Sequence, residues 1–175
     1  RGAALRRVQA IEETGATAIV TDVNYDDTVR LAKEAAEKNG WCLIQDTAWD
    51  GYEDIPRWIM QGYTTMAVEA KEQWEALRLS QPTHVSLQAG VGSFASTVLG
   101  YFVNCYQDQY PQTIVLEPDK AACIFESALA GKKSPQRVVG DLDTIMAGLS
   151  CGEPSPIAWE ILHDFADGYI EYRDY

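Results

Sequence analysis

Short apolar segments alternate with longer amphipathic segments along this chain, and this alternation limits its possible folds more than any other feature. The apolar segments predicted to be strands are residues 17–21, 41–45, 83–88, 113–118 and 168–172. The segments with a helical spacing of apolar residues are 3–14, 24–39, 56–77, 94–106, 119–130 and 157–166. Parallel strands need connections of this kind. We therefore predict an α/β fold: a three-layer, mostly parallel sheet with helices on both faces.

The composition limits the functions that such a fold can serve. The chain has 175 residues, 46% hydrophobic and 23% charged, which suffices for one domain or two small lobes. Acidic residues outnumber basic ones by 26 to 14, and the net charge of -12 would repel a nucleic acid. No apolar run approaches the roughly 20 residues of a membrane span. With two histidines, and four cysteines outside any C-x-x-C pair, we expect no metal site and a cytoplasmic protein with buried thiols.

A glycine-rich turn, in the sequence LQAGVGSFAS, lies between the predicted strand at 83–88 and the predicted helix at 94–106. Gly90 and Gly92 allow a tight turn and the close approach of an anion. The backbone amides that follow would lie at a helix N-terminus, where they can bind a phosphate, and the Ser93 hydroxyl can add a donor. The turn therefore predicts an anion site without identifying the anion.

The residues alone leave three interpretations of this turn open. Its G-x-G-x-x-A spacing is typical of dinucleotide binding, and Glu117, at the end of the next strand, would then hold the ribose. However, Glu117 lies farther from the turn than the roughly 20 residues usual for that motif, and two strand–helix units precede the turn. The phosphate monoester of pyridoxal 5′-phosphate (PLP) fits the turn as well as a pyrophosphate does. The third interpretation is a tight turn without a ligand.

In parallel sheets, ligands bind beyond the carboxyl ends of the strands. The loops in that position are residues 46–56, 88–93 and 117–120. Asp46 opens the first of these loops, which also contains further acidic and aromatic residues. A carboxylate there can act as a general base when it reaches the proton that it removes. A helix cap or a solvated loop acid is the alternative role for Asp46.

Longer stretches of the sequence resemble one enzyme family. They are IVTDVNYDDTVRLA, QDTAWDGYEDIPRWIMQGYTTM, THVSLQAGVGSFASTVLGYFVN, IVLEPDKAACIFES and GDLDTIMAGLSCGEPSPIAWEIL. Together they are similar to diaminopropionate ammonia-lyases, PLP enzymes of the fold-type II group related to threonine dehydratase and the tryptophan synthase β chain. The resemblance runs over nearly all of the chain. It implies that residues 1–62 belong to a small domain flanking the cofactor and residues 63–175 to a large domain that binds the PLP phosphate.

The resemblance also implies a reaction and the residues that carry it. The family degrades a small amino acid, 2,3-diaminopropionate, to pyruvate and ammonia. Asp46 matches an aspartate that the family uses to abstract a proton. The neighbours that would line the substrate pocket are Thr47, Trp49 and Tyr52. The residues that would hold the PLP phosphate are Gly90, Val91, Gly92, Ser93 and Phe94.

The same resemblance places part of the active site outside this chain. The family's PLP-binding lysine lies upstream of the matched part, no lysine here lies in a matching motif, and both ends look like cuts in a longer protein. We therefore expect the chain alone to be inactive, and the full-length protein to be a homodimer. Cys123 and Cys151 lie in two matched loops that would meet near the pocket mouth. A disulfide between them is one possibility, and separate thiols are the other.

Other functions stay open at this point. A serine or threonine dehydratase of the same group would share the fold and the cofactor, although QDTAWDGY and GLSCGEP favour the diaminopropionate enzymes. A nicotinamide-dependent enzyme would place Glu117 against a ribose pocket. A non-catalytic domain would only pack against other parts of its protein.

Overall fold

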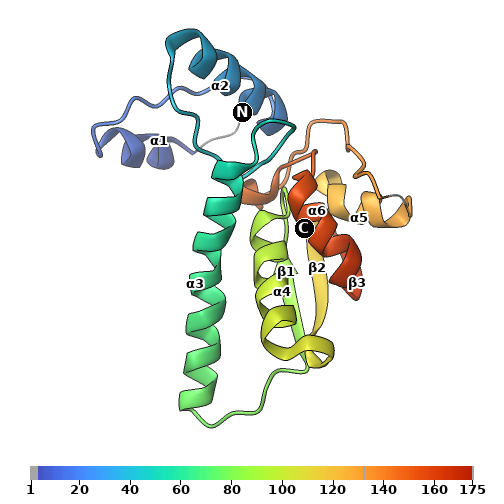
Figure 1. Ribbon diagram of the computed structural model, residues 1–175. Coiled ribbons are helices and arrows are strands. Elements are labelled where there is room, and N and C mark those ends of the chain that lie inside the picture. Colours follow the sequence, from blue (N-terminus) through green and yellow to red (C-terminus); the bar gives the residue numbers. More distant parts are fainter. Residues whose placement is uncertain (1–3, 132, 175) are drawn as a thin grey trace. The chain divides into compact units, whose positions relative to one another are not determined.

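The computed structural model describes residues 4–131 and 133–174 of the chain. Its α-helices and strands, labelled in Figure 1, are α1 (Leu5–Glu12), α2 (Tyr25–Asn39), α3 (Asp54–Ala76), β1 (His84–Gln88), α4 (Ser93–Tyr106), β2 (Gln112–Pro118), α5 (Cys123–Leu129), α6 (Pro156–Phe165) and β3 (Gly168–Tyr172). Short 3-10 helices are η1 (Gln107–Gln109), η2 (Asp119–Ala121) and η3 (Ala147–Leu149). The predicted helix over 3–14 corresponds to α1, and its first residue lies outside the described residues.

The strands form a three-stranded parallel sheet in the order β1-β2-β3. Leu87, Val115 and Tyr169 are aligned across it and point to the same face. The strand predictions at 83–88, 113–118 and 168–172 are thus confirmed, as is the parallel α/β class. Because all strands run in the same direction, the loops that follow β1 and β2 meet at one edge, where the glycine turn lies.

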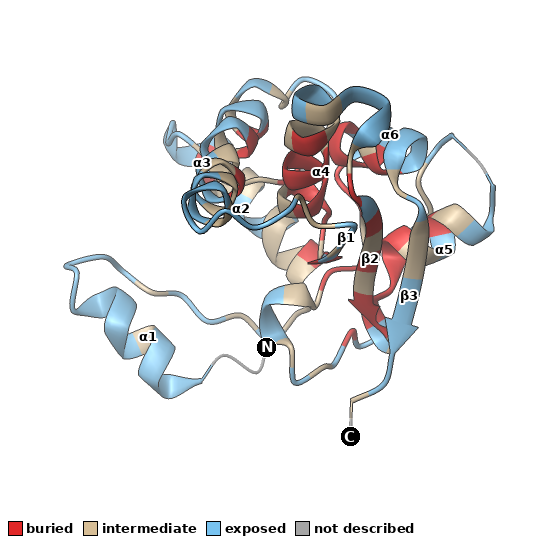
Figure 2. Ribbon diagram, turned by 90° about the horizontal axis from the view of Figure 1, so that it is seen from below, coloured by how far each residue is buried: buried red, intermediate tan, exposed pale blue. Residues whose placement is uncertain are grey.

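The hydrophobic core lies between this sheet and the helices next to it. Figure 2 shows the buried residues gathered on α4, on β2 and on parts of α5 and α6. Helix α4 packs against both α6 and α3. The core includes Leu87, Ala95, Val98, Leu99, Phe102, Val115, Ile124, Trp159 and Leu162. None of the helices within the described residues is both long enough and apolar enough to cross a membrane.

The predicted helix over 119–130 is divided in the structure. Residues 119–121 form η2, and Ala122 then leaves the helical region with φ -90° and ψ 57° before α5 begins at Cys123. Ala122 provides no side-chain cap for α5. The break therefore leaves the first amides of α5 in need of an acceptor from elsewhere in the chain.

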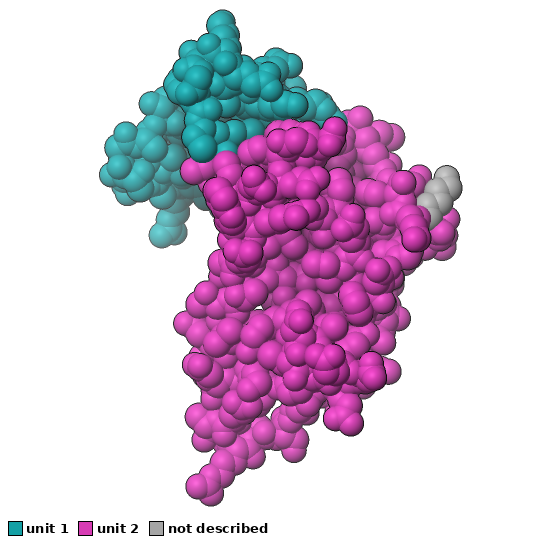
Figure 3. Space-filling view, in the orientation of Figure 1, with its two compact units in different colours: residues 1–43 teal, residues 44–175 magenta. Residues whose placement is uncertain are grey.

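The chain divides into two compact units, residues 1–43 and 44–175, coloured separately in Figure 3. In the first unit, the Asn24 side chain accepts a hydrogen bond from the Asp27 amide at the start of α2, and Gly40 ends this helix with a φ of 66°. The assignment of 1–62 and 63–175 to two domains of a longer enzyme stays a prediction.

The prediction of strands at 17–21 and 41–45 was wrong. The structure forms no strand at either segment within the described residues. Ile19 and Ile44 are 79% and 71% exposed, so these apolar runs do not pack into the core of either unit. An apolar run becomes a strand only when a neighbouring strand pairs with its backbone. Within the described residues, no strand pairs with either run.

Candidate functional site

The glycine turn joins β1 to α4 in a geometry that excludes other residues. The last ladder hydrogen bond runs from the Ala89 amide to the Leu116 carbonyl, at 2.9 Å. Gly92 then takes the left-handed conformation, with φ 94°, directly before α4. A Cβ atom on Gly92 would lie 3.1 Å from Leu162 and 3.2 Å from Ile124. Both the backbone angle and the space therefore require glycine at this position.

Gly90, the other glycine of the turn, is equally enclosed. A Cβ atom on Gly90 would lie 3.0 Å from the Cys151 sulfur and 3.3 Å from the Gly148 carbonyl oxygen. The first amides of α4 follow, and amides in the first turn of a helix have no acceptor within it. A turn with two glycines at the N-terminus of a 14-residue helix fits a phosphate group. The residues present therefore fit the phosphate end of PLP.

Asp46 lies next to this turn. The Ser93 hydroxyl donates a hydrogen bond of 2.7 Å to the Asp46 backbone carbonyl. Ser93 is 1% exposed, so in this structure its hydroxyl serves to attach the Asp46 loop. The hydroxyl was predicted as a phosphate donor, and here its proton is directed to Asp46 instead. The predicted base and the predicted phosphate turn are thus brought together.

Tyr63, on α3, contacts both parts of the site and was not predicted from the sequence. Its hydroxyl donates to Asp46 Oδ2 at 3.3 Å, and its ring meets the Phe94 ring edge-on at a centroid distance of 5.9 Å. Burial, and then the negative charge of Asp46, raise the pKa of Tyr63. The spacing of α3 indicated Tyr63 only as part of an apolar stripe, which is why its polar role was missed.

Ser155 joins the same two loops from a distant part of the sequence. Its amide donates to the Val91 carbonyl at 2.8 Å, and its Oγ accepts a hydrogen bond of 3.1 Å from the Ala48 amide. Ser155 is fully buried. It lies just after the GLSCGEP stretch, but no local pattern singled it out. One residue therefore joins the two loops: its backbone amide binds the glycine turn and its side chain binds the Asp46 loop.

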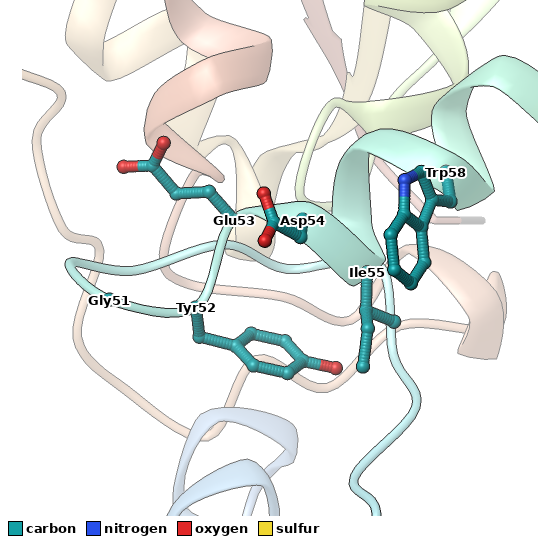
Figure 4. A pocket seen from close by; sticks show the side chains of 6 residues that line it. All are labelled: Gly51, Tyr52, Glu53, Asp54, Ile55 and Trp58. Carbon is teal, nitrogen blue, oxygen red and sulfur yellow. The ribbon is translucent and has the colours of Figure 1, made fainter.

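The predicted pocket residues divide into two groups. Thr47 is buried beside Asp46, whereas Trp49 and Tyr52 stack on each other with ring centroids 4.5 Å apart. The Tyr52 hydroxyl oxygen accepts a hydrogen bond from the Gln45 amide at 3.2 Å. Tyr52 also lines an open hollow of about 580 Å³ at the start of α3. The residues that line the hollow, labelled in Figure 4, are Gly51, Tyr52, Glu53, Asp54, Ile55 and Trp58.

Both matched-loop cysteines approach Gly90. Cys123 and Cys151 are buried thiols, whereas Cys42 and Cys105 are exposed, so the expectation of buried thiols is wrong for the latter two. The Cys123 thiol donates to the Gly90 carbonyl at 3.4 Å, while the Cys151 sulfur blocks the place of a Cβ atom on Gly90. The expectation that their loops meet near the site agrees with this placement, and the disulfide stays a prediction. Among the described residues, no group of three or more His, Cys, Asp or Glu side chains is arranged to hold a metal ion.

The position of Glu117 contradicts the dinucleotide interpretation. Glu117 is 1% exposed, and its two carboxylate oxygens accept hydrogen bonds from the amides of Ile124 and Phe125 at 2.9 and 2.7 Å. A ribose would need this carboxylate to face a ligand pocket. Instead both oxygens are directed to the start of α5. In this structure Glu117 caps the start of α5, a role that the sequence did not predict.

The chain is similar to known pyridoxal-phosphate dependent enzymes. The family described as pyridoxal-phosphate dependent enzyme matches residues 1–175. The diaminopropionate ammonia-lyase of Salmonella typhimurium strain LT2 is 52% identical over 174 residues, which are 99% of this chain and 43% of that protein. The chain thus spans less than half the length of this curated relative.

Solved structures give the same result at the level of coordinates. The diaminopropionate ammonia lyase from Escherichia coli, in complex with an aminoacrylate-PLP azomethine reaction intermediate, matches with a TM-score of 0.90 and 52% identity, covering 99% of this chain and 43% of that one. Maize serine racemase matches with a TM-score of 0.77 and 21% identity, covering 99% of this chain and 47% of that one. The second likeness shows the fold alone.

Proposed function

Since this chain belongs to the family of pyridoxal-phosphate dependent enzymes, we propose that it forms part of a fold-type II enzyme that converts 2,3-diaminopropionate to pyruvate and ammonia. The observation that supports the proposal is the glycine turn, which has no room for a side chain at Gly90 or Gly92 and ends at the N-terminus of α4. The 52% identity to a diaminopropionate ammonia-lyase supports this substrate over those of other family members.

The glycine turn would hold the phosphate of the cofactor. The residues that we assign to it are Gly90, Val91, Gly92, Ser93 and Phe94. Their backbone amides would donate to the phosphate oxygens, which suits an acidic chain because amides bind an anion without a basic side chain. When bound, PLP supplies an electron sink for the charge left on the substrate after its α proton is removed.

Asp46 would remove that proton. It is half-buried, and the Ser93 and Tyr63 hydroxyls hold its backbone carbonyl and its carboxylate, so its position relative to the turn is fixed. A general base needs this kind of fixed reach. We assign Thr47, Trp49 and Tyr52 to the substrate side of the same loop.

Further properties follow from the same proposal. The full-length protein, by which we mean one as long as the curated relatives, would be a cytoplasmic homodimer. Cys123 and Cys151 are separate thiols in this structure, and a disulfide between them would form only on oxidation and would replace the Cys123 hydrogen bond to the Gly90 carbonyl. Such a disulfide would limit movement of the phosphate turn.

The substrate assignment is tested with the full-length protein. We expect pyruvate to form from diaminopropionate with a kcat/KM at least about 100-fold higher than from serine, because a site suited to an amino leaving group discriminates against its hydroxyl analogue. A coupled pyruvate assay measures both rates. Equal or faster turnover of serine or threonine would replace the proposal with a dehydratase of the same fold.

The chain alone provides a second test. No lysine lies at the turn or in the Asp46 loop, so we expect residues 1–175 by themselves to show neither the absorbance band of covalently held PLP nor turnover of diaminopropionate. Absorbance spectra after gel filtration with PLP, and the pyruvate assay, measure this. The full-length protein treated in the same way is the positive control. Turnover by the isolated chain would mean that the active site is complete within it.

A further inference from the structure

A buried carboxyl group lies directly behind the glycine turn. Glu117 is near the end of β2 and is 1% exposed. Its two oxygens accept the amides of Ile124 and Phe125, the second and third residues of α5, at 2.9 and 2.7 Å. Because Ala122 provides no cap for this helix, the Glu117 carboxylate takes over that function from the neighbouring strand. Glu117 therefore determines where α5 starts.

The start of α5 is also the part of the molecule that supports the turn. The Cys123 thiol donates to the Gly90 carbonyl at 3.4 Å. The Ile124 side chain lies 3.2 Å from the place that a Cβ atom on Gly92 would occupy. The first two residues of α5 thus contact the two glycines of the turn, one each. A shift of this helix start would move or release both glycines.

Burial of the Glu117 carboxyl group is energetically unfavourable, and the hydrogen bonds to the α5 amides offset part of that cost. Burial raises the pKa of Glu117 to about 8, although the two amide hydrogen bonds and Cys123 act in the opposite direction. The titratable groups that interact with it are Cys123 on α5 and both Tyr169 and Glu171 on β3, and Glu171 adds to the rise. A buried carboxylate is costly to the fold. An apolar residue would pack there at lower cost but would leave the α5 amides without their acceptor.

We propose that Glu117 is a positioning residue for the phosphate site: its carboxylate fixes the start of α5, and Cys123 and Ile124 in turn fix Gly90 and Gly92. The inference rests on the proposed function insofar as it takes the ligand of the turn to be the PLP phosphate. Glu117 itself does not touch that phosphate. It acts on affinity through the rigidity of the turn.

The test uses Glu117→Gln in the full-length protein. Glutamine keeps the shape and one acceptor oxygen but presents an NH₂ group to one of the two amides. At about pH 9, where the wild-type group is ionised, we expect PLP to bind about tenfold more weakly, the factor that follows from about 1.4 kcal/mol when a charge-assisted hydrogen bond is lost. Binding of pyridoxal, which lacks the phosphate, should change less than threefold. The ³¹P resonance of the bound phosphate should broaden or shift towards that of unbound PLP.

The expected difference in PLP affinity between the wild type and Glu117→Gln depends on pH. At about pH 9 the wild-type carboxylate is ionised, because this pH lies above the pKa of about 8, and the difference from Glu117→Gln should be largest. At about pH 6.5 the wild-type group is protonated and resembles glutamine, so the two proteins should bind PLP more equally. A difference that does not change with pH would contradict a role for the ionised carboxylate.

Thr113→Val is the matched control. Thr113 is fully buried near the opposite end of the same strand, and its hydroxyl donates to the Pro111 carbonyl at 3.1 Å. This variant should lower the unfolding temperature without changing PLP affinity or the ³¹P signal. If it weakens PLP binding as much as Glu117→Gln does for the same loss of stability, Glu117 is only a structural residue and the proposal fails.

A second variant tests the contact between the start of α5 and the glycine turn if Glu117→Gln does not fold. Cys123→Ala removes the thiol contacts to Gly90 and to Glu117 but keeps the Ile124 and Phe125 amides that Glu117 binds. We expect a smaller loss of PLP affinity, of about threefold, as suits a weak thiol donor. Unchanged affinity in this variant, or in a folded Glu117→Gln, would overturn the inference while wild-type binding of PLP stands. A wild-type protein that binds no PLP would instead contradict the proposed function, and with it this inference.

Discussion

Replacing Gly92 by alanine is expected to remove most of the affinity for PLP from the full-length protein. The residue has φ 94°, and an added Cβ atom would meet side-chain atoms of Leu162, Ile124 and Ala158 at 3.1 to 3.4 Å. A non-glycine residue held in such a conformation costs roughly 1–3 kcal/mol. The turn can relieve this strain only by rotating the amides at the start of α4 away from the phosphate. We expect the Kd for PLP to rise by about 10- to 100-fold, as measured by equilibrium dialysis.

Gly100→Ala is the control for this change. Gly100 lies within α4, and a Cβ atom there would meet only Ile161, at an ordinary distance of 3.8 Å. Alanine in a helix interior is favoured over glycine by roughly 0.5–1 kcal/mol, so this variant should be slightly more stable and bind PLP as the wild type does. If Gly92→Ala bound PLP as tightly as Gly100→Ala, the phosphate site would have to lie elsewhere.

Replacing Asp46 by asparagine is expected to reduce turnover of diaminopropionate by about 10²- to 10⁴-fold, the usual contribution of a general base. Asparagine keeps the shape and the backbone carbonyl that Ser93 holds, so PLP affinity should stay within about twofold of the wild type. The loss should thus appear in kcat, as measured by the pyruvate assay. Asp50→Asn, an equal change of charge at an exposed position of the same loop, should leave kcat unchanged.

Tyr63 reports on Asp46 independently of activity. The pKa of Tyr63 is raised first by burial and second by the charge of Asp46, so Asp46→Asn should lower it while the contribution of burial remains. The neutral phenol is the form that the charge favours, and without the charge tyrosinate should form at a lower pH. Absorbance titration, with Tyr63→Phe to identify the signal, measures this. An unchanged titration would mean that the two side chains do not interact in solution.

The parts of the fold that follow from short stretches of sequence were predicted. The strands at 83–88, 113–118 and 168–172, and the glycine turn, depend on neighbouring residues that the sequence displays side by side. The cap at Asn24 and the stop at Gly40 of α2 are of the same kind. The apolar runs at 17–21 and 41–45 look alike in sequence, but a strand also needs a partner, and the sequence of a run does not state whether it has one.

The rest of the candidate site depends on contacts between distant residues. Tyr63 reaches Asp46 across 17 positions, and Ser155 reaches Ala48 across 107. No periodicity or motif connects such pairs. Glu117 was noticed because it ends a strand, yet its function became evident only from α5, whose start it holds. Local patterns therefore predicted the glycine turn, whereas the contacts that hold the Asp46 loop against it required coordinates.

The double attachment made by Ser155 implies an order in which the site is assembled. The glycine turn joins β1 to α4, and β2 follows soon after them in the sequence. Packing these elements together therefore closes only short loops. The Asp46 loop is fastened to it by Ser93, 47 residues away, and by Ser155, 107 residues from Ala48. Long loops close later during folding than short ones. We therefore expect a folding chain to form the glycine turn first and to attach the Asp46 loop to it last, so that Asp46 reaches its final position only after the turn exists.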